Sequence, residues 1–96
     1  MTLQQNMQHL ALANDLRLEI LSLKSEIDGY NNPVCINSML EDMSDYWDDN
    51  KTEQTFYPSK QDYLIHCSNN WLECKAKTEK ELAKVTAKFN RMMKQH

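Results

Sequence analysis

The chain has 96 residues, which is enough for one small domain with a limited core. Hydrophobic residues make up 41% and charged residues 26%, as in folded soluble chains, but one glycine and two prolines are too few for a fold of strands and tight turns. The net charge is −3, but the charges are unevenly distributed along the chain. Residues 26–62 contain nine acids and two bases, whereas residues 75–96 contain seven bases and two acids. We therefore expect a single all-α domain over residues 1–96, with an acidic middle and a basic tail.

The N-terminal residues and the number of cysteines indicate the cellular compartment in which the protein is expected. The first twenty residues lack the basic start and apolar block of a secretion signal, and no apolar run is long enough to span a bilayer. The number of cysteines is odd (Cys35, Cys67 and Cys74), which favours reduced thiols in a reducing compartment. We expect a cytoplasmic protein that does not bind membranes.

The first predicted helix covers about residues 3–28. Its end is predicted from Gly29, which readily adopts left-handed backbone, and from Pro33 shortly after it. Leu3, Met7 and Leu10 form a short stripe that is out of phase with the main one, which predicts a different neighbour for the first turns. The main apolar stripe, at steps of three and four residues, consists of Ala13, Leu16, Ile20, Leu23 and Ile27.

The second predicted helix is short and covers about residues 34–48. Either Asn32 caps it with Pro33 at the first helical position, or residues 33–36 are extended and the helix starts at Asn37 or Ser38. The following polar stretch, residues 49–58, has no period and is predicted to be a loop. With either start, one face of the second predicted helix carries Ile36, Met39, Leu40, Met43 and Trp47.

The third predicted helix, about residues 60–94, is the longest. Ser59, with Asp62 three residues later, approximates a capping box at its start. The polar triplet 68–70 allows a kink, but the apolar pattern keeps its phase through it, so we expect one continuous helix. This seam follows a heptad with one extra four-residue step near Thr78, and consists of Leu64, Cys67, Trp71, Cys74, Leu82, Val85, Phe89 and Met92.

Two long helices and one short one predict a coiled-coil-like helical hairpin. The third predicted helix is longer than the first, so its apolar end has no neighbour within the hairpin. Leaving this end in water is unfavourable, because burying each large side chain is worth roughly 1.5–3 kcal/mol. We expect a second copy to cover it in a homodimeric helical bundle. A partner protein would also cover it, and a broken third helix would allow a monomeric three-helix bundle. The expected oligomer interface consists of Leu16, Ile20, Leu23, Trp71, Leu82, Val85 and Phe89.

Acidic and aromatic residues are mixed in the second helix and after it. Aromatic side chains amid charge are typical of interface hot spots, although a solvated acidic face with two aromatic anchors is the simpler interpretation. The functional hypothesis is a docking surface for a basic partner protein. Its residues are Asp45, Tyr46, Trp47, Asp48, Asp49, Phe56 and Tyr57.

Basic residues recur at three- and four-residue steps in the last third of the chain. They form either the solvated exterior of a helix or a phosphate-binding stripe for nucleic acid. The residues are Lys77, Lys80, Lys84, Lys88 and Arg91.

No catalytic, metal or cofactor site is expected. The sequence has no glycine-rich phosphate loop and no nucleophile elbow. His66, Cys67 and Cys74 do not have the spacing that puts metal ligands on one helix face, and the two cysteines, one heptad apart, are predicted to pack in the seam.

The sequence therefore favours a non-enzymatic interaction protein that binds and regulates, or inhibits, another protein. Its glutamine- and asparagine-rich, glycine-poor composition suits an accessory protein of a phage or mobile element. The alternative is a nucleic-acid-binding helical dimer that uses the lysine-rich helix.

Overall fold

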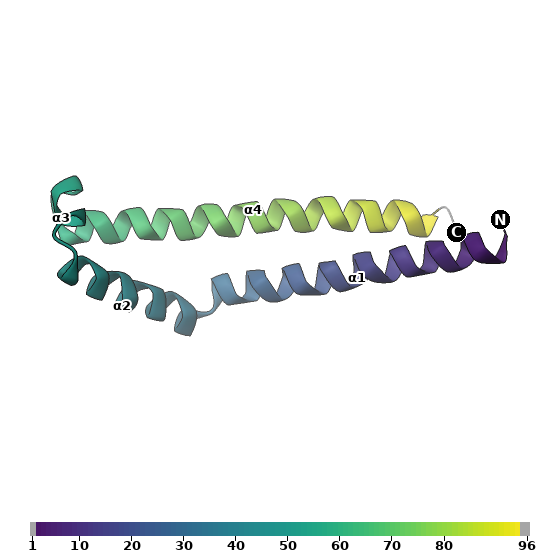
Figure 1. The fold of residues 1–96 in the computed structure, drawn as a ribbon, viewed down its shortest axis with the longest axis horizontal. Coiled ribbons are helices and arrows are strands. Elements are labelled where there is room, and N and C mark those ends of the chain that lie inside the picture. The colour runs from purple at the N-terminus through teal and green to yellow at the C-terminus, as the bar shows by residue number, and fades with distance from the viewer. Residues whose placement is uncertain (1, 95–96) are drawn as a thin grey trace. The chain divides into compact units, whose positions relative to one another are not determined.

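The computed structural model describes residues 2–94, of which 91% are helical, with no strand among them. The helices are α1 (Leu3–Asn31), α2 (Pro33–Asp49), α3 (Glu53–Phe56) and α4 (Lys60–Lys94) (Figure 1). The prediction of an all-α fold with long helices is confirmed. The helix count is different, because the stretch predicted to be a loop contains the single turn α3.

The described residues divide into two compact units, to which α1 and α4 both contribute. The terminal unit contains residues 2–27 and 77–94, and the central unit contains residues 28–76. The charge gradient follows this division. The central unit has nine acids against three bases, whereas the terminal unit has five acids against eight bases.

The terminal unit is an antiparallel pair made of the first part of α1 and the last part of α4 (Figure 1). The main apolar stripe of α1 packs inside this pair, since Ala13 and Leu16 are only 7% and 5% exposed, and Val85 on α4 is 6% exposed. A ring nitrogen of His9 also lies 3.2 Å from the main-chain oxygen of Met92. Within the described residues, these three side chains are the buried hydrophobic residues of the unit, because two helices can enclose little.

The junction between α1 and α2 corrects the prediction at Gly29. α1 continues through Gly29 to Asn31, and Gly29 does not have a positive φ. The helix instead ends where the chain must leave helical geometry, at Asn32, because the residue before a proline is disfavoured in the α region. Asn32 is extended, with φ −76° and ψ 120°, and its Oδ1 accepts a 2.9 Å hydrogen bond from the Val34 amide. Of the two starts that the sequence allows for α2, the structure therefore has the one at Pro33.

Side-chain caps also explain why α3 and α4 begin where they do. Oδ1 of Asn50 accepts 3.1 Å hydrogen bonds from the amides of Thr52 and Glu53, which turns the chain into α3. At the start of α4, the Ser59 hydroxyl accepts from the Asp62 amide at 3.2 Å and donates to the Asp62 carboxylate at 3.0 Å.

α4 then continues through the polar triplet 68–70 without a break. The Ser68 hydroxyl donates a 2.9 Å hydrogen bond to the carbonyl of Leu64, one turn back along the helix. Ser68 is thus accommodated within the helix instead of ending it.

No helix in residues 2–94 combines the length and the apolar character that crossing a bilayer requires.

Candidate functional site

The central unit is organised around the buried ring of Tyr63, which is 5% exposed. Three aromatic rings surround it: Trp47 is stacked at a centroid distance of 5.3 Å and an interplanar angle of 26°, Tyr57 lies at 5.3 Å and Tyr46 at 6.3 Å. These distances are within the range in which aromatic pairs attract one another. The rings come from α2, α4 and the segment after α3, so the aromatic cluster joins these elements.

The hydroxyl of Tyr63 points towards sulfur atoms. It donates to Sδ of Met43 at 3.8 Å. Burial raises the pKa of Tyr63 to about 12, and a hydrogen bond with Cys67 and the nearby charge of Glu53 act in the same direction. Tyr63 therefore keeps its proton to a higher pH than an exposed tyrosine does, and its ring is the anchor of the cluster.

We call the residues that the sequence analysis proposes as a docking surface the acidic–aromatic surface; they are Asp45, Tyr46, Trp47, Asp48, Asp49, Phe56 and Tyr57. The structure brings three of its four aromatic residues into the cluster around Tyr63. The three carboxylates are exposed, and Tyr46 and Phe56 are 44% and 72% exposed. The half-buried residues of the surface are Trp47 and Tyr57.

Two polar contacts fix α2 to the elements that follow it. Nε2 of Gln54 donates a 2.7 Å hydrogen bond to the carbonyl of Trp47, which ties α3 to the end of α2. Nζ of Lys60 lies 3.0 Å from the carboxylate of Asp48. Phe56, at the end of α3, is thereby presented to solvent on a constrained turn.

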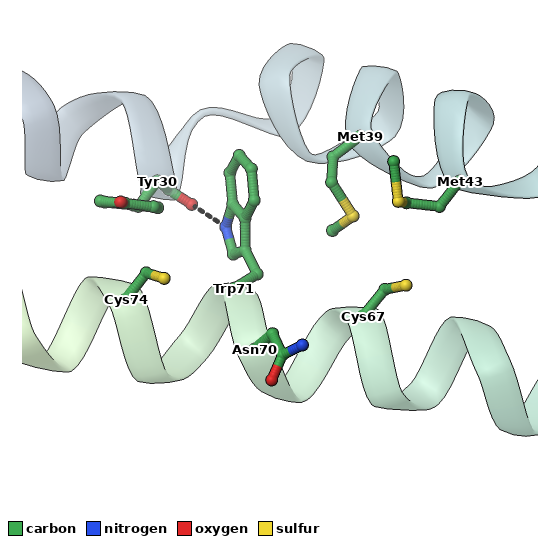
Figure 2. Close-up of a pocket in the computed structure, with 7 residues that line it drawn as sticks. All are labelled: Tyr30, Met39, Met43, Cys67, Asn70, Trp71 and Cys74. Carbon is green, nitrogen blue, oxygen red and sulfur yellow. Dashed lines mark hydrogen bonds between the residues drawn. The ribbon is translucent and has the colours of Figure 1, made fainter. Parts of the chain in front are cut away.

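A pocket of about 310 Å³ opens in the same unit (Figure 2). Its lining is mostly apolar and sulfur-rich. We call it the methionine pocket, and its lining residues are Tyr30, Met39, Met43, Cys67, Asn70, Trp71 and Cys74.

One wall of the methionine pocket is held by Trp71, whose indole N–H donates a 3.1 Å hydrogen bond to the carbonyl of Tyr30 (Figure 2). The two rings also meet edge to face, with centroids 5.1 Å apart. This carbonyl lies at the end of α1, where the last helical turn has no backbone donor for it. Trp71 thus caps α1 and shapes the pocket with one side chain.

The sequence did not predict Tyr30, Met39 and Met43 as site residues. The four-residue spacing of the two methionines placed them on one face of the helix, and that face also fits a filled core. No pattern in a single sequence distinguishes a filled core from one with a pocket between its helices.

The remaining predicted site residues lie on α1 and α4. Leu16 and Val85 are buried within one chain, so a second copy is not needed to cover them, and Trp71 lies in the central unit. The half-buried members of the predicted oligomer interface in the terminal unit are Ile20, Leu23, Leu82 and Phe89.

The basic stripe on α4 is exposed to solvent throughout its length. At about 100° per residue, its members fall within roughly one quarter of the helix circumference, and they span about 21 Å of the axis. The residues are Lys77, Lys80, Lys84, Lys88 and Arg91.

Histidines, cysteines and acidic residues are the side chains to examine for metal or disulfide sites in the part of the chain that the structure describes. Residues 2–94 contain no group of three or more histidine, cysteine or acidic side chains that could hold a metal ion. Cys35 and Cys67 are half-buried thiols, Cys74 is an exposed one, and none of the three is in a disulfide.

Comparisons with protein-family models, with curated proteins and with solved structures gave no significant match to this chain.

Proposed function

We propose that this chain is a protein-docking module that binds a basic segment of another protein on its central unit and regulates that protein. The observation that carries the proposal is the pairing of exposed Tyr46 and Phe56 with the carboxylates of the acidic–aromatic surface. Aromatic side chains held in place lose little conformational freedom on binding, which is typical of interface anchors. The carboxylates would attract and orient basic side chains around these anchors.

The methionine pocket supports the same proposal. It is large enough for an apolar side chain, and methionines adapt to partners of different shape. Since the central unit has nine acids against three bases, a partner segment that combines basic residues with an apolar anchor fits it best. An amphipathic basic helix has this combination.

We also propose that the chain works as a homodimer. Two helices bury few side chains in the terminal unit, and large apolar residues remain exposed on α1. A symmetric pair of copies would remove that surface from water.

A direct test of docking uses a 20-residue lysine/leucine amphipathic peptide as the probe and follows tryptophan fluorescence during titration. We expect Phe56→Ala to weaken binding about tenfold, and Asp45→Lys combined with Asp48→Lys to weaken it more. Phe56 is 72% exposed, so its removal leaves the fold intact.

The matched control is Asp15→Lys, a charge reversal at an exposed site on α1 in the terminal unit. It should bind the peptide within about threefold of the wild type, because weak long-range charge effects are screened by salt. Equal affinities for the wild type, Phe56→Ala and the double charge reversal would contradict the proposed docking surface. A peptide whose leucines are replaced by alanine should bind much more weakly; if it binds equally well, the attraction is charge alone.

Nucleic-acid binding is the second candidate, and the exposed basic stripe on α4 favours it. Five phosphate contacts predict that log K falls with log salt concentration with a slope of about −4 to −5 on duplex DNA. Titration of a random 30-base-pair duplex at several salt concentrations measures this slope. Changing Lys80, Lys84 and Lys88 together to glutamine removes three of the five contacts, so the slope should become less negative by about three. An unchanged slope would exclude the basic stripe as the contact surface.

A further inference from the structure

Sulfur-bearing side chains gather on one side of the methionine pocket. Four of the seven lining residues carry sulfur, two methionines from α2 and two cysteines from α4. Figure 2 shows three of them on one side of the Trp71 ring and Cys74 on the other. We call these three residues the sulfur set; they are Met39, Met43 and Cys67.

The sulfur atoms of Met43 and Cys67 both lie within hydrogen-bonding distance of one oxygen atom. The hydroxyl of the buried Tyr63 donates to Sδ of Met43 at 3.8 Å and is also hydrogen-bonded to the side chain of Cys67. The two sulfur atoms are therefore near neighbours, although their residues belong to different helices. Met39 precedes Met43 by four residues, so its side chain leaves α2 on the same face.

We propose that the sulfur set is a binding site for a soft monovalent metal ion, Cu(I). Thiolate and thioether sulfur are the ligands that select Cu(I) in proteins. When the ion binds, the thiol proton of Cys67 is released to solvent, and the thiolate sulfur donates an electron pair to the copper. The thioether sulfurs of Met39 and Met43 complete the coordination, and the oxidation state of the copper does not change.

Charge selects a monovalent ion for this site. Among the described residues that line the methionine pocket, no side chain is a carboxylate, an imidazole or a base. One thiolate neutralises one Cu(I), so the loaded site carries no net charge. A divalent ion bound to the same thiolate would leave one positive charge uncompensated beside apolar side chains, which is unfavourable.

The donor atoms select against the commoner protein metals as well. Zinc sites combine several cysteine, histidine or carboxylate ligands, and calcium and magnesium require oxygen ligands. The sulfur set supplies one thiol and two thioethers. Cys74 does not add a second thiolate to the same ion, because one heptad separates it from Cys67, which is about 10 Å along the helix axis.

Tyr63 holds the sulfur set in position. Its ring is fixed by the aromatic cluster, and its hydroxyl contacts two of the three sulfur-bearing side chains. Metal ligands are commonly oriented by hydrogen bonds from a second layer of residues. The members of the set are half-buried beside a pocket of about 310 Å³, which gives an ion a path to them.

Anaerobic titration of the full chain with Cu(I), in competition with a chromophoric Cu(I) chelator, measures the affinity and the stoichiometry. Cys35→Ser combined with Cys74→Ser leaves Cys67 as the remaining thiol and serves as the background for the other variants. This double variant should bind one Cu(I) per chain, with an affinity within about threefold of the tightest wild-type site. Loss of tight binding in the double variant would overturn the proposal, because the other thiols would then hold the copper.

Methionine-to-leucine changes test the thioethers, because leucine keeps an apolar side chain of similar volume. In the double-serine background, Met39→Leu and Met43→Leu should each weaken Cu(I) binding about tenfold or more, since losing a partner at a metal site typically costs about 10–100-fold in affinity.

The matched control is Met92→Leu, at a half-buried methionine of the terminal unit, which should stay within about threefold of the background. Circular dichroism confirms that all these variants are helical. If both pocket variants bind Cu(I) as tightly as the background does, the thioethers are not ligands and the proposal is overturned.

X-ray absorption identifies the ligands without relying on a variant. In protein that contains selenomethionine, the copper-edge spectrum of the loaded wild type should show selenium as well as sulfur in the first coordination shell. Met39→Leu combined with Met43→Leu should remove the selenium signal and leave sulfur. A wild-type spectrum without selenium would overturn the proposal even if copper binds.

Zn(II) alone provides the selectivity test. It should bind the double-serine background at least about 1,000-fold more weakly than Cu(I) does, because the site offers one thiolate and no hard ligand. Comparable affinities for the two ions would overturn the proposal. Peptide docking is measured without metal and with changes at Phe56, Asp45 and Asp48, which are outside the sulfur set, so the two proposals fail independently.

Discussion

Ionisation of Tyr63 should control the stability of this protein at high pH. The pKa of Tyr63 is raised from 10.0 to about 12, mainly by burial, so the unfolded chain loses this proton at a lower pH than the folded chain does. The contribution to stability is fully present below pH 10 and is lost as the pH rises from 10 through 12.

The size of the effect follows from the difference between the two pKa values. Two units correspond to about 2–3 kcal/mol if the hydroxyl is fully shielded from water. Met43, which accepts the hydrogen bond of this hydroxyl, also lines the methionine pocket, which is open to solvent. Because solvent screening weakens such effects, we expect the loss to be about 1–2 kcal/mol.

Tyr63→Phe isolates this contribution, since it keeps the buried ring and removes the titrating group. At pH 8 its free energy of unfolding should lie within about 1 kcal/mol of the wild type, because a hydrogen bond to sulfur at 3.8 Å is weak. Between pH 10 and 12 the wild type should lose stability relative to Tyr63→Phe, until the variant is the more stable of the two or nearly equal.

Urea unfolding followed by circular dichroism at 222 nm, with reductant, at pH 8, 10, 11 and 12 measures this difference. Effects of lysines and other tyrosines are common to both proteins and cancel in the comparison. Tyr46→Phe, which removes a hydroxyl from a ring that is 44% exposed, controls for the substitution itself. If the wild type and Tyr63→Phe lose stability in parallel over the whole range, the hydroxyl is not shielded and the reasoning is refuted.

Three smaller changes test the local structure, each by thermal and urea unfolding. Gly29→Ala should stabilise the protein by about 0.5–1 kcal/mol, because Gly29 is helical and a Cβ there meets nothing within 4 Å; a destabilisation would indicate left-handed backbone instead. Asn32→Ala should lower the free energy of unfolding by about 1 kcal/mol, because the N-cap hydrogen bond of α2 is lost, whereas Asn32→Asp should keep most of this stabilisation. Asp48→Asn should cost less than about 1 kcal/mol, since its ion pair with Lys60 is exposed, and a larger loss would mean that the pair is shielded.

The fold class was predictable because the composition leaves no alternative to long helices. The start of α4 was predictable for a local reason, since Ser59 and Asp62 satisfy each other within one turn. The end of α1 was predicted wrongly because a sequence with a glycine shortly before a proline has two interpretations. The helix can end at Gly29 in left-handed backbone, or it can continue through Gly29 and end at the residue before Pro33. The proline restricts the residue before it in every context, whereas the glycine is only permissive, and the proline decided the outcome.

The candidate sites were predictable only in part, and the reason is again physical. Acids and aromatic residues close together in the chain were recognisable as a surface. The anchoring role of Tyr63 depends on rings brought together from α2, α4 and the segment after α3, and such a contact leaves no periodic signal in a single sequence. The methionine pocket depends on incomplete filling between helices, which is determined by the volumes of side chains that lie far apart in the chain.

α1 carries more apolar surface than its packing against α4 uses. A helix that packed only against α4 would need one apolar stripe, and the buried residues Ala13 and Leu16 belong to that stripe. The large apolar residues that remain exposed on α1 are Leu3, Met7, Leu10, Leu12, Leu18 and Leu21. Apolar side chains in water favour association, because association removes their surface from the solvent. This is the physical reason for proposing a homodimer, in which a second copy would cover that surface.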